Sequence, residues 1–297
     1  MAALFEGLVS RPLQMLGLQG TPPDQLEVLD EMRRLLRDEG VDGDVVPESD
    51  LRRFLEARQF SPSAATEMYL AWRVWYSTPL PKLEGRMFKD VDFGERVMTP
   101  ANILDFEIPG LSAFNAKHSC LSSLCGEDRE GAPILWEKTG LSSSHFQGML
   151  EDMSESDMIT LHILQQEIMV KRLEQSSLKH GRCIDKFVVV SDLDQLTLSL
   201  DPGAMRLFLT LSALDQKNYP ERLKKLYFVN TPFYWWPIWS VVWPFMSPGT
   251  VNKIQFLGTD FRPSLFEQVD EANIPTDFGG TMVTSWDGIA GIAGQSS

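Results

Sequence analysis

The stretch Leu226–Met246 reads LYFVNTPFYWWPIWSVVWPFM and contains no charged residue. It holds half of the chain's eight tryptophans, namely Trp235, Trp236, Trp239 and Trp243. About 20 apolar residues would suffice to cross a bilayer, but Pro232, Pro237 and Pro244 argue against one continuous helix, because each removes a backbone donor. Aromatic rings with polar tips favour the boundary between water and lipid. Leu226–Val229 is therefore predicted to be a strand, and the aromatic segment after it is a candidate contact for an amphiphile.

Short polar motifs flank this stretch on both sides. Residues 218–222 read NYPER before it, and residues 250–254 read TVNKI after it. An apolar segment framed by a few charged groups suggests a protein that handles an amphiphile. The competing interpretation is a strand and a helix of an ordinary core, and the stretch and its flanks leave both open.

The whole chain is acidic and long enough to bury a large core. Its 297 residues are 43% hydrophobic, and they carry a formal net charge of −14 with a pI near 4.8. This charge argues against nucleic acid as a partner, and it requires any membrane contact to be local and apolar. Three cysteines make no even disulfide framework, which indicates a reducing cytosol. Cys120 and Cys125 lack the second pair of ligands that a zinc site needs, so no metal is expected.

The N-terminal part of the chain is predicted to be helical. Residues 1–23 form an arm without the basic start and long apolar core of a signal peptide, and either a surface helix or disorder would fit them. Residues 24–85 form an all-helical subdomain, with one helix up to Gly40, a second over 48–58 and a third that opens with Ser61-Pro62. In the first helix, apolar residues recur at helical spacing: Leu26, Leu29, Met32, Leu35 and Leu36.

From about residue 100 the pattern changes to strands that alternate with helices. Strands are predicted at Ile134–Trp136, Phe187–Val190, Leu226–Val229 and Lys253–Leu257. Long helices are predicted over residues 154–175 and from Pro202 through Leu214. This alternation predicts an α/β fold with a mainly parallel sheet over residues 100–283, followed by a loose tail at 284–297.

Seven motifs in order resemble the CRAL-TRIO lipid-binding family, and within it the Sec-fourteen-type phosphatidylinositol/phosphatidylcholine transfer proteins. They are LRRFLEARQF (51–60), EGAP (130–133), VVVSDLD (188–194), NYPER (218–222), LYFVNTP (226–232), TVNKIQFLG (250–258) and IPTDFGG (274–280). The resemblance spans residues 24–282 and implies a helical bracket followed by a lobe whose sheet floors a deep apolar pocket for one lipid. It also implies a gating helix after Pro237, with Trp239, Val242 and Trp243 on one face. The expected gate and membrane contacts are Trp235, Trp236, Trp239, Val242, Trp243 and Phe245.

The resemblance also implies two headgroup sites. Lys253 and Thr250 would bind the phosphate of phosphatidylinositol, Glu221 would accept hydrogen bonds from inositol, and Arg58 would complete the cationic side. Gln59 stands where the family commonly has a basic residue, which weakens the expected pull on phosphate. Thr197 and Ser199 match hydroxyl positions of the choline-lipid headgroup site, although they could equally cap a loop.

The resemblance favours a binding protein over an enzyme. The chain contains no G-x-S-x-G nucleophile motif, and His118, His145, His162 and His180 have no recognisable motif partner. We therefore expect a cytoplasmic monomer that carries phospholipid, needs no cofactor and touches membranes transiently. A neutral ligand such as tocopherol or a retinoid, and a lipid-regulated scaffold with a lipid kinase or another protein as partner, remain alternatives.

Overall fold

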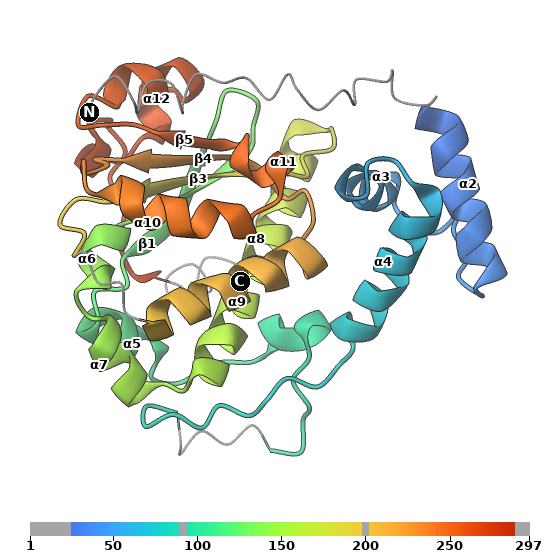
Figure 1. The fold of residues 1–297 in the computed structure, drawn as a ribbon, viewed down its shortest axis with the longest axis horizontal. Coiled ribbons are helices and arrows are strands. Elements are labelled where there is room, and N and C mark those ends of the chain that lie inside the picture. Colours follow the sequence, from blue (N-terminus) through green and yellow to red (C-terminus); the bar gives the residue numbers. More distant parts are fainter. Residues whose placement is uncertain (1–24, 89–93, 198–201, 289–297) are drawn as a thin grey trace.

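The computed structural model describes residues 25–88, 94–197 and 202–288. Three helices form a small helical subdomain on one side, and a larger α/β lobe fills the other side (Figure 1). Each part has its own cluster of buried apolar side chains. None of the helices in these ranges combines the length and apolar character needed to span a bilayer.

The helical subdomain contains α2 (Gln25–Asp38), α3 (Glu48–Ala57) and α4 (Pro62–Tyr76). Pro62 opens α4 as predicted, because the first helical position needs no backbone donor, whereas the Ser61 side chain forms no capping hydrogen bond. Leu26 is exposed, so the predicted apolar stripe of α2 is wrong at its first position. The most buried side chains of the subdomain core are those of Leu29, Met32, Leu36, Leu51, Phe54, Leu55 and Ala65.

The lobe is built on a five-stranded sheet in the order β1 (Ser122–Glu127), β2 (Pro133–Glu137), β3 (Phe187–Asp192), β4 (Leu223–Val229) and β5 (Ile254–Phe256). The β1–β2 pair is antiparallel, and the pairs from β2 to β5 are parallel. The predicted α/β class with a mainly parallel sheet is confirmed. The sequence pattern does not reveal β1, because its residues SSLCGE are small or polar and its pairing is interrupted at Gly126. Gly126 has a φ of 71°, and a side chain there would meet the carbonyl of Asn273.

Long crossover helices connect the parallel strands. α8 (Glu155–His180) lies between β2 and β3, and α9 (Pro202–Asn218) lies between β3 and β4. Ser154 caps α8 by accepting a hydrogen bond from the Asp157 amide, and Gly181 ends the helix in a left-handed conformation. α8 thus continues past the predicted end at Gln175, because no helix-stopping residue occurs before Gly181.

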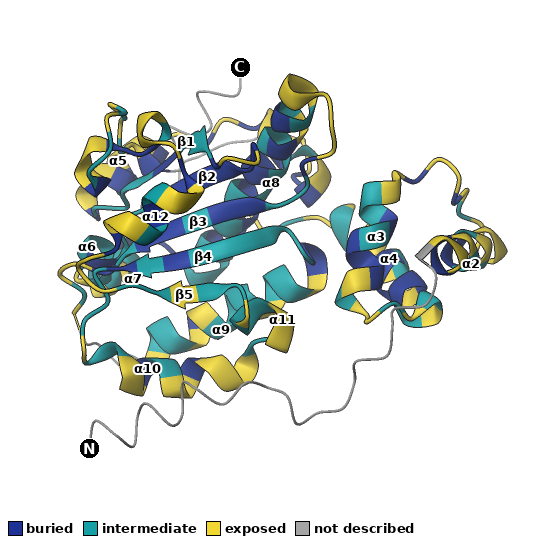
Figure 2. Cartoon of the chain, turned by 90° about the horizontal axis from the view of Figure 1, so that it is seen from above, coloured by how far each residue is buried: buried dark blue, intermediate teal, exposed yellow. Residues whose placement is uncertain are grey.

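Shorter helices complete the lobe. α10 (Trp235–Val242), η2 (Trp243–Phe245) and α11 (Pro248–Val251) follow β4, and α12 (Arg262–Gln268) follows β5. In Figure 1, α12 lies above the sheet, whereas α8, α9 and α10 lie on its other side. Burial is deepest on β2 and β3 and falls toward β5 at the sheet's edge (Figure 2). The remaining short helices are η1 (Pro100–Asp105), α5 (Leu111–Lys117), α6 (Thr139–Ser143), α7 (Phe146–Asp152), η3 (Glu271–Asn273) and η4 (Thr276–Phe278).

Candidate functional site

A cavity of about 370 Å³ lies within the lobe, between the β1–β2 end of the sheet and the helices α5, α7, α8 and α9. Its apolar wall consists of Phe114, Met149, Met153, Met158, Leu161 and Leu211. Methionine side chains are flexible and polarisable, so this wall can adapt to ligands of irregular shape. The volume is near the lower end for a pocket that encloses a small organic molecule.

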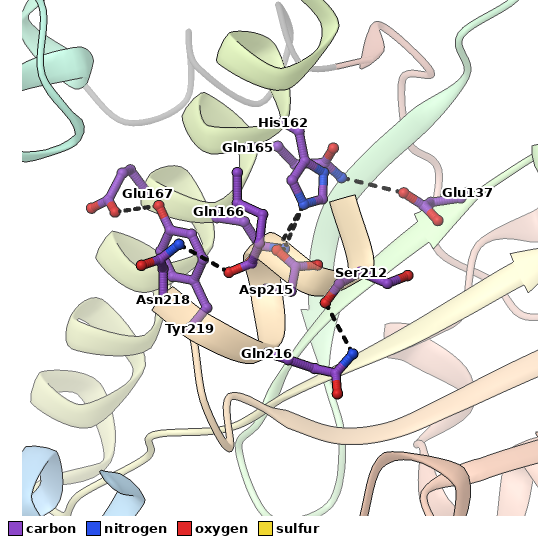
Figure 3. Close-up of polar contacts among 11 residues, drawn as sticks. Glu137, His162, Gln165, Gln166, Glu167, Ser212, Asp215, Gln216, Asn218 and Tyr219 are labelled. Carbon is purple, nitrogen blue, oxygen red and sulfur yellow. Dashed lines mark hydrogen bonds and ion pairs between the residues drawn. The ribbon is translucent and has the colours of Figure 1, made fainter. Parts of the chain in front are cut away.

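Polar side chains from α8 interrupt this apolar wall. Gln165 donates a hydrogen bond to Glu137 at 3.2 Å, and His162 Nε2 lies 2.8 Å from Asp215 on α9. Gln166 donates to the same Asp215 carboxylate at 3.1 Å, so Asp215 ties α9 to two successive turns of α8 (Figure 3). Glu137, His162 and Gln165 all line the cavity. The cavity therefore offers hydrogen-bonding groups within a largely apolar surface.

Burial and the neighbouring polar groups shift the pKa of Glu137, and likewise that of His162, in opposite directions. Burial raises the pKa of Glu137 above its ordinary value, although the hydrogen bond from Gln165 and the charge of His162 oppose the shift. Burial disfavours the His162 imidazolium, but the Asp215 carboxylate, with a smaller contribution from Glu137, raises the pKa of His162 overall. Relative to the free side chains, the cavity wall thus shifts Glu137 toward its neutral form and His162 toward its charged form.

The structure brings three of the predicted phosphoinositide residues together, outside this cavity. Glu221 precedes β4 and Lys253 precedes the neighbouring parallel β5, so both lie at the amino ends of adjacent strands. Lys253 Nζ lies 2.5 Å from Glu221 Oε2. Thr250 lies one helical turn before Lys253 and pairs with the Ser247 hydroxyl at 2.8 Å. A cation, a carboxylate and a hydroxyl thus share one corner of the lobe.

Arg58 has a different environment. Its side chain is exposed at the end of α3 and donates to the carbonyl of Ala57 at 3.1 Å. One charged link from α3 to the lobe is Glu56, which accepts from Lys186 at 2.8 Å. Burial would lower the pKa of Lys186, but Glu56, followed by Asp185 and Glu221, raises it. Lys186 therefore carries a positive charge between α3 and the Glu221 corner.

Of the predicted choline-lipid residues, Thr197 lies at the opposite end of the strands from the Glu221–Lys253 pair. Thr197 follows the carboxyl end of β3, and its backbone and hydroxyl contact the Ser143 hydroxyl at 3.1 and 3.2 Å. Ser199 lies outside the described residues, as do the arm at 1–23 and most of the tail at 284–297. A strand of seven residues such as β4 is about 20 Å long. Thr197 and the Glu221–Lys253 pair are therefore separated by roughly the length of a strand.

The predicted gate forms a short helix that packs on the edge of the sheet. Trp235, Trp236 and Trp239 surround Phe256 of β5, with ring centroids 6.4, 5.3 and 4.9 Å away. Phe256 also stacks on Phe228 of β4 at 5.3 Å. α10 thus covers β4 and β5, whereas the described cavity lies over β1 and β2 and takes none of its lining residues from α10.

Two details of the predicted gate are wrong. The helix begins at Trp235 rather than after Pro237, because a proline is tolerated within the first turn. Trp239, Val242 and Trp243 do not share a face: Val242 is 5% exposed, whereas Trp243 is 50% exposed. The helix ends between Val242 and Trp243, and the following 3-10 turn rotates Trp243 outward. Large exposed side chains gather here: Phe233, Trp236, Val241, Trp243 and Phe245.

The family profile described as "CRAL/TRIO domain" matches residues 117–280, which is more than half of the chain. The chain belongs to the CRAL/TRIO domain family. The match covers the whole sheet, α10 and the Glu221–Lys253 corner, together with the cavity lining apart from Phe114 and Asn115. Membership of this family supports lipid binding or lipid transfer in general.

Individual relatives place the chain in the Sec14-like branch of the CRAL/TRIO family. It is 26% identical to a CRAL-TRIO domain-containing protein of Saccharomyces cerevisiae, over 90% of this chain and 82% of that protein. It is 27% identical to the SEC14 cytosolic factor of Kluyveromyces lactis, over 90% of this chain and 83% of that protein. The crystal structure of Sfh5 shares the fold, with a TM-score of 0.59, 14% identity, and coverage of 90% and 94% of the two chains.

The polar wall of the CRAL/TRIO cavity was not predicted from the sequence. Glu137 directly follows the predicted strand Ile134–Trp136, and His162 and Gln165 lie within a predicted helix, but none belongs to a recognisable motif. Asp215, the partner of His162, is 53 residues away along the chain. Only the packing of α9 against α8 brings the two side chains together.

Proposed function

We propose that this protein binds one phospholipid, phosphatidylinositol or phosphatidylcholine, and exchanges it between membranes as a monomer that works from the cytoplasm. The observation that carries the proposal is the Glu221–Lys253 pair beside Thr250. A lysine has three N–H donors, so Lys253 can keep Glu221 at 2.5 Å and also donate to a lipid phosphate. The second oxygen of Glu221 can then accept from inositol hydroxyls, and such charge-assisted hydrogen bonds are strong and selective.

A phospholipid needs a carrier protein to cross water because of its acyl chains. Each methylene exposed to water costs about 0.8 kcal/mol, so a free diacyl lipid in water is strongly disfavoured. A cavity of about 370 Å³ is too small for two long acyl chains together with a headgroup. Loading therefore requires the lobe to open, and the α10 segment is the proposed gate because it rests on the sheet through aromatic contacts and presents apolar side chains outward.

A neutral amphiphile is the second candidate ligand. The observation that favours it is the cavity wall, where Glu137, His162 and Gln165 provide donors and acceptors suited to one hydroxyl group. Such a ligand needs neither Lys253 nor Glu221. The two candidates therefore predict different consequences of removing Lys253.

The first test is the lipid content of the protein after incubation with vesicles that contain equal amounts of phosphatidylinositol and phosphatidylcholine. Native mass spectrometry should find one phospholipid per chain in the wild type. Lys253→Ala removes a charge-assisted hydrogen bond and should reduce phosphatidylinositol loading about tenfold. Phosphatidylcholine loading should remain, because its proposed contact Thr197 lies at the opposite end of the strands.

The matched control is Lys82→Ala, which removes an exposed lysine between α4 and η1. It should load both lipids as the wild type does. A wild type that takes up no phospholipid would contradict the proposal, and one that instead takes up a neutral amphiphile would establish the second candidate. An equal loss of both phospholipids in Lys253→Ala would show that the assigned headgroup contact is wrong.

A further inference from the structure

The turn that carries Glu221 has an unusual backbone. Glu221 has a φ of 60°, in the left-handed region that residues other than glycine rarely adopt. Such a conformation costs about 1–2 kcal/mol and persists only where the surroundings hold it. Tyr219, two residues before Glu221, and Arg222, directly after it, are each anchored in the interior.

Tyr219 anchors the turn to α8. Its hydroxyl donates to Glu167 at 2.7 Å, as Figure 3 shows, and its ring packs edge-on against Trp75 of α4 with centroids 5.7 Å apart. Tyr76, also on α4, donates to the other oxygen of Glu167 at 2.9 Å. Glu167 is buried, and each of its two carboxylate oxygens accepts a hydrogen bond from one tyrosine. Of these two tyrosines, only Tyr219 belongs to the turn that carries Glu221.

Arg222 anchors the turn from its other end. Its guanidinium lies 3.4 Å from Asp50 of α3 and donates to the carbonyl of Asp185 at 3.3 Å. The carbonyl of Arg222 accepts from the Phe187 amide at 2.8 Å, which ties the turn to the start of β3. Burial, together with the nearby charge of Arg53, lowers the pKa of Arg222 to about 10, so the group is still charged at neutral pH.

We infer that Tyr219 and Arg222 are positioning residues for headgroup recognition: together with Glu167 and Asp50 they hold the 219–222 turn so that Glu221 meets Lys253. The helical subdomain thereby contributes to lipid selectivity through Asp50 and Trp75, without contacting the lipid at these positions. Glu56 of α3 acts on the same corner through Lys186. This inference rests on the proposed function, because it concerns the selectivity of the same site.

The test compares two phenylalanine variants that each remove one hydrogen bond from the same carboxylate. Tyr219→Phe loosens the turn, whereas Tyr76→Phe leaves the turn's own anchor in place and controls for the loss of a bond to Glu167. The readout is the ratio of phosphatidylinositol to phosphatidylcholine loaded from mixed vesicles, which general destabilisation does not change. Tyr219→Phe should lower this ratio roughly fivefold, as expected for one hydrogen bond, and Tyr76→Phe should change it less than about twofold.

A double-mutant cycle shows whether Tyr219 acts through Glu221. In a Glu221→Gln background, which itself lowers the ratio, adding Tyr219→Phe should cause no further fall. Arg222→Lys keeps the charge facing Asp50 but cannot make both guanidinium contacts, and it provides the same comparison if Tyr219→Phe fails to fold.

The outcomes separate the inference from the function on which it rests. If Glu221→Gln lowers the ratio while Tyr219→Phe and Arg222→Lys do not, the inference is overturned and the proposed headgroup site stands. Additive effects of Tyr219→Phe and Glu221→Gln also overturn it. If the wild type loads neither lipid, the proposed function fails and the inference fails with it.

Discussion

At the scale of single residues, the charge of His162 contributes to the contact between α8 and α9, two helices that line the cavity. Its imidazole reaches across from α8 to Asp215 of α9 at 2.8 Å, and Gln166 joins the same carboxylate. The attraction of Asp215 outweighs burial and raises the pKa of His162 above its ordinary value. A histidine whose folded pKa is raised contributes stability that is fully present below its unfolded pKa of about 6.5 and is lost as the pH rises through the folded value.

The resulting prediction concerns the pH dependence of stability. The free energy of unfolding of the wild type should exceed that of His162→Gln by more at pH 6 than at pH 9, because glutamine cannot gain the charge that pairs with Asp215. Urea unfolding across this range measures the difference. His145→Gln is the control, since the single polar side-chain contact described for His145 is with Ser119 at 3.5 Å. A difference that is constant with pH, or that grows as the pH rises, would contradict the assignment.

At the scale of elements, the aromatic segment formed by α10 and the turn after it presents some rings to the protein interior and others to solvent. Trp239 faces inward and meets the Phe256 ring edge-on at 4.9 Å. Trp243 and Phe245 lie beyond the helix end, with 50% and 59% of their surface exposed. An inward tryptophan stabilises the closed lobe, whereas outward aromatic rings can enter the boundary between water and lipid.

Two alanine variants should therefore behave differently. Trp239→Ala should lower the free energy of unfolding by on the order of 2 kcal/mol, because it removes a half-buried ring from the aromatic cluster. Trp243→Ala should change stability by less than about 0.5 kcal/mol, as is usual for a surface position, yet slow vesicle-to-vesicle exchange. Thermal unfolding and a fluorescent lipid-transfer assay measure the two effects. If Trp243→Ala exchanges lipid at the wild-type rate, this surface does not serve membrane contact.

At the scale of the whole molecule, the net charge of −14 opposes approach to anionic membranes. The repulsion acts over about 10 Å at 0.1 M salt and over about 3 Å at 1 M salt. Apolar contact by the exposed α10 segment is not weakened by salt. An anionic membrane therefore repels the molecule as a whole, although the exposed α10 segment is suited to enter the membrane surface.

This balance predicts the effect of salt on exchange. Between about 0.1 M and 1 M salt, the rate of exchange with anionic vesicles should rise or stay constant, because salt screens only the repulsion. With vesicles of neutral lipid the rate should change little, which serves as the control. A rate that collapses with added salt on anionic vesicles would show that docking depends on local positive charge instead of the aromatic segment.

The amino-acid sequence by itself determined the order and type of the main elements. The Ser61-Pro62 start of α4, the apolar run of β3 and the long periodic pattern of α8 are local signals, each written in neighbouring residues. The α/β class and the mainly parallel sheet follow from this alternation. The motif order also indicated the family, and by resemblance it assigned Arg58, Glu221, Thr250 and Lys253 to one headgroup site.

Only the tertiary structure decided which distant residues meet. Glu221 and Lys253 are 32 positions apart in the chain and meet because β4 pairs with β5, and the contact between His162 and Asp215 requires α9 to pack on α8. The same holds for β1, whose small and polar residues pair only because β2 lies beside them. Local patterns reflect interactions between neighbours in the chain. The distances within a site depend instead on strand register and helix packing, which the whole folded chain sets together.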